Sequence, residues 1–323
     1  MIYERSLKEK ISKKLKDYYP DRKLSIRDMT LVKNVRAMVL RFDLFEDNHK
    51  ANEIYVKILE KGAKEQVLEL KNLNEYKDLL LMPRIIDFFE DFNAVVMEGV
   101  KGGTLSKALV FYTLPIVGNF YEVRLLDYAR KIGRGLGLLH KFTERRKLRI
   151  GDMNLGMITG VKVSPYIRTL LGVDLFNNIL NRIEEIEDEK ASFVQVHRDP
   201  TPHNILVKRD EIHLVDFAFK RGASFEDTLA FSIGLELMEN RLPFFSKSLL
   251  EEMKHLFFNY YEEFFHHPFE EDFWSFLKLL RCLQQLIVYN QRKTSLKNYI
   301  LESIDKKYLL DRIWELSLKL NLR

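Results

Sequence analysis

The chain has 323 residues, 46% hydrophobic and 31% charged, which is the composition of a soluble globular protein with one large domain or two lobes. Lysine and arginine number 52, aspartate and glutamate 47, and the net charge of +5 is too small for this length to indicate nucleic-acid binding. No stretch approaches 18 consecutive apolar residues, so we expect no transmembrane segment, while peripheral contact with a membrane stays open.

The cysteine count and the first residues indicate a cytoplasmic protein. The single cysteine, Cys282, has no partner for an internal disulfide, as is typical of the reducing cytosol. Residues 1–14 lack the apolar core of a secretory signal. We expect Cys282 itself to be a small, buried side chain in a helix.

The first hundred residues predict helices and short strands. Leu7, Ile11 and Leu15 recur at helical spacing among charged residues, which indicates an amphipathic surface helix over 4–18. Three strands are expected next: about 24–32, 35–46 and 52–60. The third contains Lys57 amid β-forming residues, and a lysine on an edge strand often extends its ammonium group into water.

A helix is predicted over 63–78, with apolar Val67, Leu70 and Leu73 on one face. Glu65 and Glu69 are four residues apart and share another face. Further on, the apolar run 94–97 leads into Glu98, Gly99 and Val100 and then a glycine pair. By itself this pattern predicts a strand that ends in a glycine turn.

A long helix is predicted over about 122–141, because its apolar residues follow the 3.6 period. Gly133, Gly135 and Gly137 each weaken such a helix by roughly 1 kcal/mol relative to alanine. Their presence therefore indicates close packing against another element. We expect His140, near its end, to be structural.

The segment 142–191 is harder to interpret. We expect a strand over 157–163 and then a helix that contains the apolar residues Leu175, Ile179, Ile183 and Ile186. After Asp227 the chain is expected to be helical to its end, with aromatic side chains at helical spacing that form a core.

The stretch 192–219, SFVQVHRDPTPHNILVKRDEIHLVDFAF, holds the polar residues of greatest interest. Residues 193–196 predict a strand, and the two prolines of 197–203 predict a loop, because neither helix nor ladder continues through them. Residues 204–207 and 212–215 then predict a hairpin around a polar turn.

This arrangement brings three side chains to one end of a small sheet. Asp199 lies in the loop, Asn204 begins the hairpin, and Asp216 follows its second strand. Two carboxylates and a carboxamide at one place are the groups needed to hold a hydroxyl nucleophile and a divalent metal near a phosphate.

The motif His197-Arg198-Asp199-x-x-x-x-Asn204, followed by a hydrophobic residue and Asp216-Phe217, resembles the catalytic and metal loops of the protein-kinase-like fold. The details are similar to its small-molecule branch: aminoglycoside phosphotransferases, choline kinases and lipopolysaccharide-sugar kinases. In that branch an Asp-Leu-Ala-like helix start soon follows, and Glu226-Asp227-Thr228-Leu229-Ala230 fills this place.

The resemblance implies an α+β, bilobal fold. Its small N-terminal lobe, residues 1–98, would be an antiparallel sheet with one key helix, and its large C-terminal lobe, residues 99–323, would be mainly helical. It also implies ATP and Mg²⁺ as cofactors. Asp199 would accept the proton of the acceptor hydroxyl, and Asn204 and Asp216 would bind the metal.

In the first lobe, the resemblance implies that Lys57 binds the nucleotide's phosphates and that a glutamate of the 63–78 helix fixes its ammonium group. Glu65 is the expected partner, with Glu69 as the alternative. Backbone groups of Glu98, Gly99 and Val100 would bind the adenine edge. The family's glycine-bearing turn corresponds to about 31–35, which has no glycine, so the residues that cradle the phosphates stay unassigned.

Other residues near the loops have supporting roles. We expect His197 to pack beneath Asp216, and Asp227 to cap its helix and tie it to the loop. Asp152 and Asn154 lack the four-residue gap of the motif and are interpreted as a decoy. A competing hypothesis makes His197, Asp199 and His203 ligands of zinc or iron, but it leaves Lys57 and Asp216 without a role.

The acceptor is expected to be compact. Asp216 and Asp227 are eleven positions apart, with no Ala-Pro-Glu anchor of the kind that protein kinases use to bind a peptide. This favours a hydroxyl of a sugar, glycan, amino-alcohol or aminoglycoside, with residues 142–191 as candidates for acceptor contacts. A serine/threonine protein kinase and a nucleotide-binding pseudokinase scaffold remain the alternatives.

Overall fold

The computed structural model describes residues 2–20, 22, 24–33, 38–47, 49–112, 118–242, 247–266, 269–291 and 296–322. The chain forms two compact units: Met1–Gly102 with His213–Val215, and Gly103–Ile212 with Asp216–Arg323. The turn predicted at 31–35 lies outside the described residues from Asn34 onward. The assignment of functional lobes to 1–98 and 99–323 stays a prediction.

The first unit is built on a five-stranded antiparallel sheet in the order β1-β2-β3-β5-β4. Its elements are α1 (Ile2–Tyr18), β1 (Leu24–Lys33), β2 (Val39–Glu46), β3 (His49–Ile58), α2 (Lys64–Asn72), β4 (Ile85–Phe89) and β5 (Ala94–Glu98). The predicted N-terminal helix, the three strands and the strand before the glycine turn are confirmed. The sequence analysis did not identify β4.

Helix α2 is shorter than the predicted 63–78. It ends at Asn72 and gives way to a 3₁₀ turn over Asn74–Tyr76. The side chain of Asn74 accepts a hydrogen bond from the Ile85 N–H (2.9 Å) and donates one to the Ile85 carbonyl (2.7 Å). These two bonds tie the chain to the start of β4, so it leaves the helix early.

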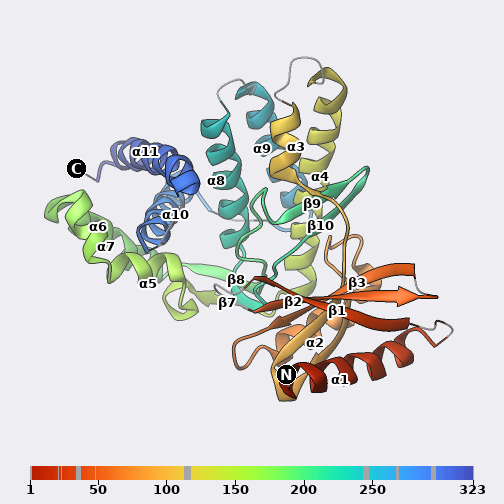
Figure 1. Ribbon diagram of the computed structural model, residues 1–323. Coiled ribbons are helices and arrows are strands. Elements are labelled where there is room, and N and C mark those ends of the chain that lie inside the picture. Colours follow the sequence, from red (N-terminus) through yellow and green to blue (C-terminus); the bar gives the residue numbers. More distant parts are fainter. Residues whose placement is uncertain are drawn as a thin grey trace. The chain divides into compact units, whose positions relative to one another are not determined.

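Helix α1 covers one face of this sheet (Figure 1). Leu7, Ile11 and Leu15 pack with buried side chains of the strands, among them Ile54 and Val56 of β3. Because side chains alternate along a strand, Lys57 lies on the opposite face from Val56.

The second unit is mainly helical. It contains β6 (Gly103–Thr104), α3 (Leu105–Tyr112), α4 (Gly118–Thr143), β7 (Arg146–Arg149), α5 (Gly156–Lys162), α6 (Pro165–Leu171), α7 (Val173–Glu187), β8 (Lys190–Val196), β9 (Ile205–Lys208), β10 (Glu211–Leu214, whose last two residues belong to the first unit), β11 (Lys220–Ala223), α8 (Phe225–Arg241), α9 (Lys247–Glu262), α10 (Glu271–Gln291) and α11 (Leu296–Lys319). Within the described ranges, no helix has the length and apolarity needed to cross a membrane.

Two small sheets carry the predicted loops. Their strand orders are β10-β9-β6 and β11-β8-β7. The predicted strand and hairpin of 193–215 are confirmed as β8, β9 and β10. The sequence analysis did not identify β7 or β11, which both pair antiparallel with β8.

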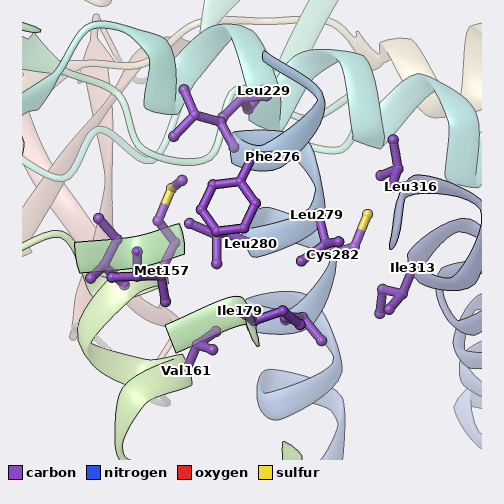
Figure 2. Close-up of a cluster of buried hydrophobic side chains, with 14 of the residues drawn as sticks. Met157, Val161, Ile179, Leu229, Phe276, Leu279, Leu280, Cys282, Ile313 and Leu316 are labelled. Carbon is purple, nitrogen blue, oxygen red and sulfur yellow. The ribbon is translucent and has the colours of Figure 1, made fainter. Parts of the chain in front are cut away.

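A large apolar core joins α5, α7, α8, α10 and α11 (Figure 2). Cys282 lies in it beside Leu279, with Ile313 and Leu316 across from its sulfur. Burial raises the pKa of this thiol to about 12, which keeps it protonated and inert. The expectation of a small buried residue in a helix is confirmed.

The strand predicted over 157–163 is wrong, because this segment is helix α5. Its buried residues Met157, Ile158 and Val161 have helical spacing and pack in the core that α10 shares. Tertiary packing therefore overrides the strand preference of the β-branched residues.

Helices α4 and α9 approach closely at glycines. A Cβ at Gly133 would lie 2.2 Å from the carbonyl oxygen of Phe257, and one at Gly137 would lie 2.8 Å from that of Tyr261. Both contacts are shorter than van der Waals distances allow. The close packing expected from the glycines is confirmed at these two positions.

Gly133→Ala is expected to lower the free energy of unfolding of the second unit by roughly 1–3 kcal/mol, because the methyl group meets backbone that has to move. Urea unfolding followed by the fluorescence of Trp274 and Trp314, the chain's two tryptophans, measures it. The control is Gly160→Ala in α5, whose Cβ would make an ordinary 3.8 Å contact with Ile287. Equal stability of the two variants would contradict the packing account.

Candidate functional site

Asp199 and Asn204 are brought together in the loop between β8 and β9. The Asn204 Nδ2 group donates to the backbone carbonyl and to Oδ2 of Asp199, both at 2.9 Å. The Asn204 N–H also donates to the Thr201 carbonyl at 2.8 Å. With its NH₂ group bound in this way, the amide presents Oδ1, an acceptor with two lone pairs, as the atom available to a cation.

The carboxylate of Asp199 is accessible, with 55% of its side chain exposed. Its Oδ1 lies 3.9 Å from Nη2 of Arg281 on α10, whose side chain is largely buried. The Asp199 N–H faces Nδ1 of His197 at 3.4 Å. The sequence analysis missed Arg281, because the helical C-terminal region showed only core periodicity.

The buried side chain of Asp227 holds the start of the β8–β9 loop in place. It is fully buried in the first turn of α8, and its two oxygens accept the N–H groups of His197 (2.7 Å) and Arg198 (2.6 Å). Arg198 has φ +74°, a left-handed conformation that costs about 1 kcal/mol or more in a residue other than glycine. The two hydrogen bonds to a charged acceptor offset that cost.

A second pair of side chains holds Asp227. Nε2 of His140 lies 3.1 Å from Oδ2 of Asp227, and Nδ1 of His140 lies 2.7 Å from the hydroxyl of Tyr261. Since an ionised carboxylate only accepts, Nε2 of His140 donates to Asp227 and Nδ1 accepts from Tyr261. Burial would raise the pKa of Asp227, but the hydrogen bonds that its carboxylate accepts from His140 and from the His197 N–H outweigh burial and lower the pKa.

These contacts confirm the structural role expected of His140 and the link expected between Asp227 and the loop. The expected helix cap is wrong. The oxygens of Asp227 serve the loop amides and His140, and the N-cap residue Ser224 makes no capping hydrogen bond through its side chain.

Asp216 follows β10 and lies at the same end of the hairpin as Asn204. Residues 209 and 210 join β9 to β10, and so short a connection makes the two strands antiparallel. Asp216 is half-buried and has φ +68°. The buried ring of His197, expected beneath Asp216, packs on the next residue, Phe217, with ring centroids 4.5 Å apart.

In the first unit, Lys57 is 6% exposed. It lies in the middle of the sheet, opposite Val39 of β2 and Val95 of β5, so it is not the edge-strand lysine of the alternative interpretation. On α2, Glu65 is exposed and Glu69 is half-buried.

The turn after β5 is fixed by backbone contacts. The N–H of Glu98 donates to the Arg84 carbonyl at 2.9 Å, and that of Gly99 donates to the Glu53 carbonyl at 2.7 Å. A Cβ at Gly99 would lie 2.7 Å from the Glu53 oxygen, so only glycine fits. In the described part of the chain, the N–H of Val100 makes no backbone hydrogen bond.

A cavity of about 360 Å³ lies beside Asp199 in the second unit. Its walls come from the loop and from α8, α10 and α11. None of residues 142–191, the segment expected to contact an acceptor, lines it. The expected acceptor contacts of that segment stay a prediction, and the C-terminal helices occupy the position beside the loop.

Comparison with known proteins places the chain by its fold. No protein-family model matches the sequence, and neither does any curated protein. Among solved structures, the choline kinase LicA from Streptococcus pneumoniae matches with a TM-score of 0.57 at 15% identity, over 98% of this chain and 100% of that one. The protein-kinase-like fold is confirmed.

Two further structures agree. Amicoumacin kinase hAmiN, in complex with AMP-PNP, Ca²⁺ and Ami, matches with a TM-score of 0.58 at 13% identity, over 97% of this chain and 96% of that one. A glucosamine kinase matches with a TM-score of 0.56 at 12% identity, over 90% and 94%. The resemblance to small-molecule kinases is thus confirmed in the fold, with an N-terminal antiparallel sheet and a helical C-terminal part.

Asp227→Ala is expected to lower the free energy of unfolding by roughly 3–5 kcal/mol, because it leaves buried donors without their acceptor. Urea unfolding with tryptophan fluorescence measures it. Asp174→Ala is the control: Asp174 is an exposed aspartate in the first turn of α7, and its loss should cost less than about 1 kcal/mol. Similar losses in both variants would refute the anchoring role.

The contribution of Asp227 to stability depends on pH. Because folding lowers the pKa of Asp227 from its ordinary 3.8, the stability that its charge contributes is complete above that value. It is lost as the pH falls through the lowered pKa. The gap between wild type and Asp227→Ala should therefore stay constant above pH 3.8 and shrink only below it.

Proposed function

We propose that this protein is an ATP- and Mg²⁺-dependent phosphotransferase that moves the γ-phosphoryl group to a hydroxyl of a small molecule or glycan. The observation that carries the proposal is the Asp199–Asn204 pair. One accessible carboxylate and one oriented amide share a loop that a buried aspartate holds in place. This arrangement occurs in a chain with the protein-kinase-like fold.

The donor atoms fit magnesium. Oδ1 of Asn204 and the carboxylate of Asp216 are hard oxygen ligands, and they lie at the same end of the hairpin. When bound, the metal neutralises charge on the phosphate oxygens.

The zinc or iron hypothesis lacks such support. Among the residues that the structure describes, no three His, Cys, Asp or Glu side chains are grouped to hold a metal. The ring of His197 is buried against Phe217, and Nε2 of His203 contacts Arg241.

Asp199 acts on the acceptor. Its carboxylate orients the hydroxyl and takes the proton as the acceptor oxygen bonds to the γ-phosphorus and the bond to the β–γ bridging oxygen breaks. ADP leaves with the electron pair of that bond. Most of the catalytic work is placement, so the rigidity that Asp227 gives the loop contributes directly.

The first unit supplies the nucleotide contacts in this proposal. Lys57 binds phosphate oxygens, and the N–H of Val100, with the backbone at Glu98 and Gly99, binds the adenine edge. Glu65 was the expected partner of Lys57. The half-buried position of Glu69 suits a buried ammonium group better than the exposed position of Glu65.

A small acceptor suits the cavity and the loop length. A volume of about 360 Å³ holds a small molecule. The short segment between Asp216 and Asp227 contains β11, which pairs with β8, so it offers no long activation segment for a peptide. The similar structures include a choline kinase and a glucosamine kinase, which favours a sugar or amino-alcohol hydroxyl. The buried single cysteine suits action in the cytoplasm.

Asp199→Asn is expected to lower kcat about 10²–10⁴-fold and to leave the affinity for Mg²⁺–ATP unchanged, because only the proton acceptor is lost. ADP release on a panel of sugars, amino-alcohols and aminoglycosides measures kcat, and calorimetry measures the affinity. Asp210→Asn, in the exposed β9–β10 turn, is the matched control and should behave as wild type.

Two outcomes would contradict the proposal. Tight Mg²⁺–ATP binding by the wild type without transfer to any acceptor would indicate a pseudokinase scaffold. Transfer to a protein serine or threonine but to no small molecule would indicate a protein kinase.

A further inference from the structure

A second cavity, of about 390 Å³, lies among the helices of the second unit. Its walls come from α8, α9, α10 and α11, and no described residue lines both this cavity and the one beside Asp199. A cavity of this volume holds a small molecule. Its ligand is therefore separate from the phosphoryl transfer proposed for Asp199, and the side chains of its wall indicate the ligand's chemistry.

Part of the wall is apolar. Leu229 of α8 and Leu316 of α11 line the cavity and belong to the large core (Figure 2). Phe258 of α9 and Trp274 of α10 add two aromatic rings, which meet edge to face with their centroids 6.2 Å apart. Such a surface favours a ligand whose body is an apolar ring.

The charged side chains of the wall are positive inside the cavity and negative at its solvent-exposed edge. Lys278 and Arg312 are largely buried, with 18% and 24% of their side chains exposed. The two carboxylates of the wall, Glu271 and Glu315, are 83% and 64% exposed. They pair with Lys319 and Arg312, each at 2.5 Å, and ion pairs with partners so exposed contribute little. The interior of the cavity therefore presents positive charge.

One buried carboxylate behind the wall, that of Glu236, does not balance this charge. Its Oε1 accepts from Lys278 and lies 3.4 Å from Nζ of Lys254, and its Oε2 accepts the hydroxyl of Tyr308 at 2.7 Å. Burial would raise the pKa of Glu236, but the charge and hydrogen bond of Lys278 outweigh burial and lower the pKa, so the group is ionised. Nε of Arg312 lies 4.0 Å from Oε2 and, although buried, has no hydrogen-bond partner among the described residues. Three cations thus share one buried negative charge.

Two serine hydroxyls add donors to the same wall. Ser232 of α8 and Ser275 of α10 are buried residues that line the cavity. Neither hydroxyl makes a hydrogen bond to another residue that the structure describes. A hydroxyl can donate one hydrogen bond, and a charged oxygen is a stronger acceptor than a neutral one. Donors and positive charge in one place are what an oxyanion requires.

We propose that this cavity binds a small oxyanion, a carboxylate or a phosphate ester, carried on an apolar ring. Its oxygens bind the two serine hydroxyls and meet the positive charges of Lys278 and Arg312, and its ring packs on the aromatic wall. A cationic ligand would add to the excess of positive charge, and a neutral ligand would leave that excess uncompensated. No sequence motif marks this site, because its residues come from four helices.

Matched aromatic ligands test the site by binding, without turnover. Benzoate and phenyl phosphate are the anions, benzamide is the neutral counterpart and benzylamine is the cation, and each is titrated by calorimetry into the whole protein. At least one anion should bind about tenfold or more tightly than benzamide, because it gains hydrogen bonds to a charged group. The anion that binds more tightly decides between a carboxylate and a phosphate ester.

Substitutions in the wall locate the anion. Arg312→Gln should reduce the affinity for the anion about tenfold or more. Ser232→Ala combined with Ser275→Ala should also reduce it, and this variant keeps every ion pair, so it decides the test if Arg312→Gln fails to fold. Lys307→Gln, which removes an exposed cation from the same helix as Arg312, is the matched control and should bind as wild type does.

A fluorescence measurement places the anion independently of these variants. Trp314→Phe leaves Trp274 as the only tryptophan, and its fluorescence should change saturably as the anion is added. No binding of either anion, equal affinity for benzamide, or a preference for benzylamine would overturn the site. Anion binding that leaves Trp274 unchanged, or that survives both wall variants, would overturn it too. None of these outcomes depends on whether the protein transfers phosphoryl groups.

Discussion

The hydrogen bonds from the backbone of His197 and Arg198 to the buried carboxylate of Asp227 are the interaction on which the rest of the site depends. They hold Arg198 in a left-handed conformation that an arginine does not otherwise favour. This conformation sets the direction in which the chain leaves β8. Asp227 is in turn held by His140, so two helices, α4 and α8, and a loop distant in sequence share one buried charge.

The anchor at Asp227 orients the groups of the loop. The loop ends at Asn204, whose NH₂ group donates to the carbonyl and to Oδ2 of Asp199. Oδ1 of Asn204 and Oδ1 of Asp199 take no part in these two hydrogen bonds. The same loop rests on α8 at Gly234, and the cavity begins there. The accessible carboxylate of Asp199, the free amide oxygen of Asn204 and the cavity are thus consequences of one chain path, and the proposed function gives them the roles of proton acceptor, metal ligand and acceptor pocket.

Local sequence patterns were sufficient to predict several of the strands and the loop that carries Asp199. β-forming residues indicated the strand that contains Lys57, and the two prolines after the strand at 193–196 indicated the loop that carries Asp199. Prediction failed where tertiary contacts decide, as at Met157–Val163, a β-branched segment that packs as a helix. Arg281 was missed for a related reason: helical periodicity shows that a face is buried, but it does not show which side chain borders a cavity.

The central claim is that the loop and hairpin of the second unit hold the metal of a bound nucleotide. A crystal structure with Mg²⁺ and AMP-PNP tests it most directly. The account predicts a magnesium ion bound by Oδ1 of Asn204 and by a carboxylate oxygen of Asp216, with Asp199 outside its ligand shell and facing the cavity. A nucleotide whose metal contacts neither Asn204 nor Asp216, or a magnesium ion bound by Asp199 in their place, would contradict it.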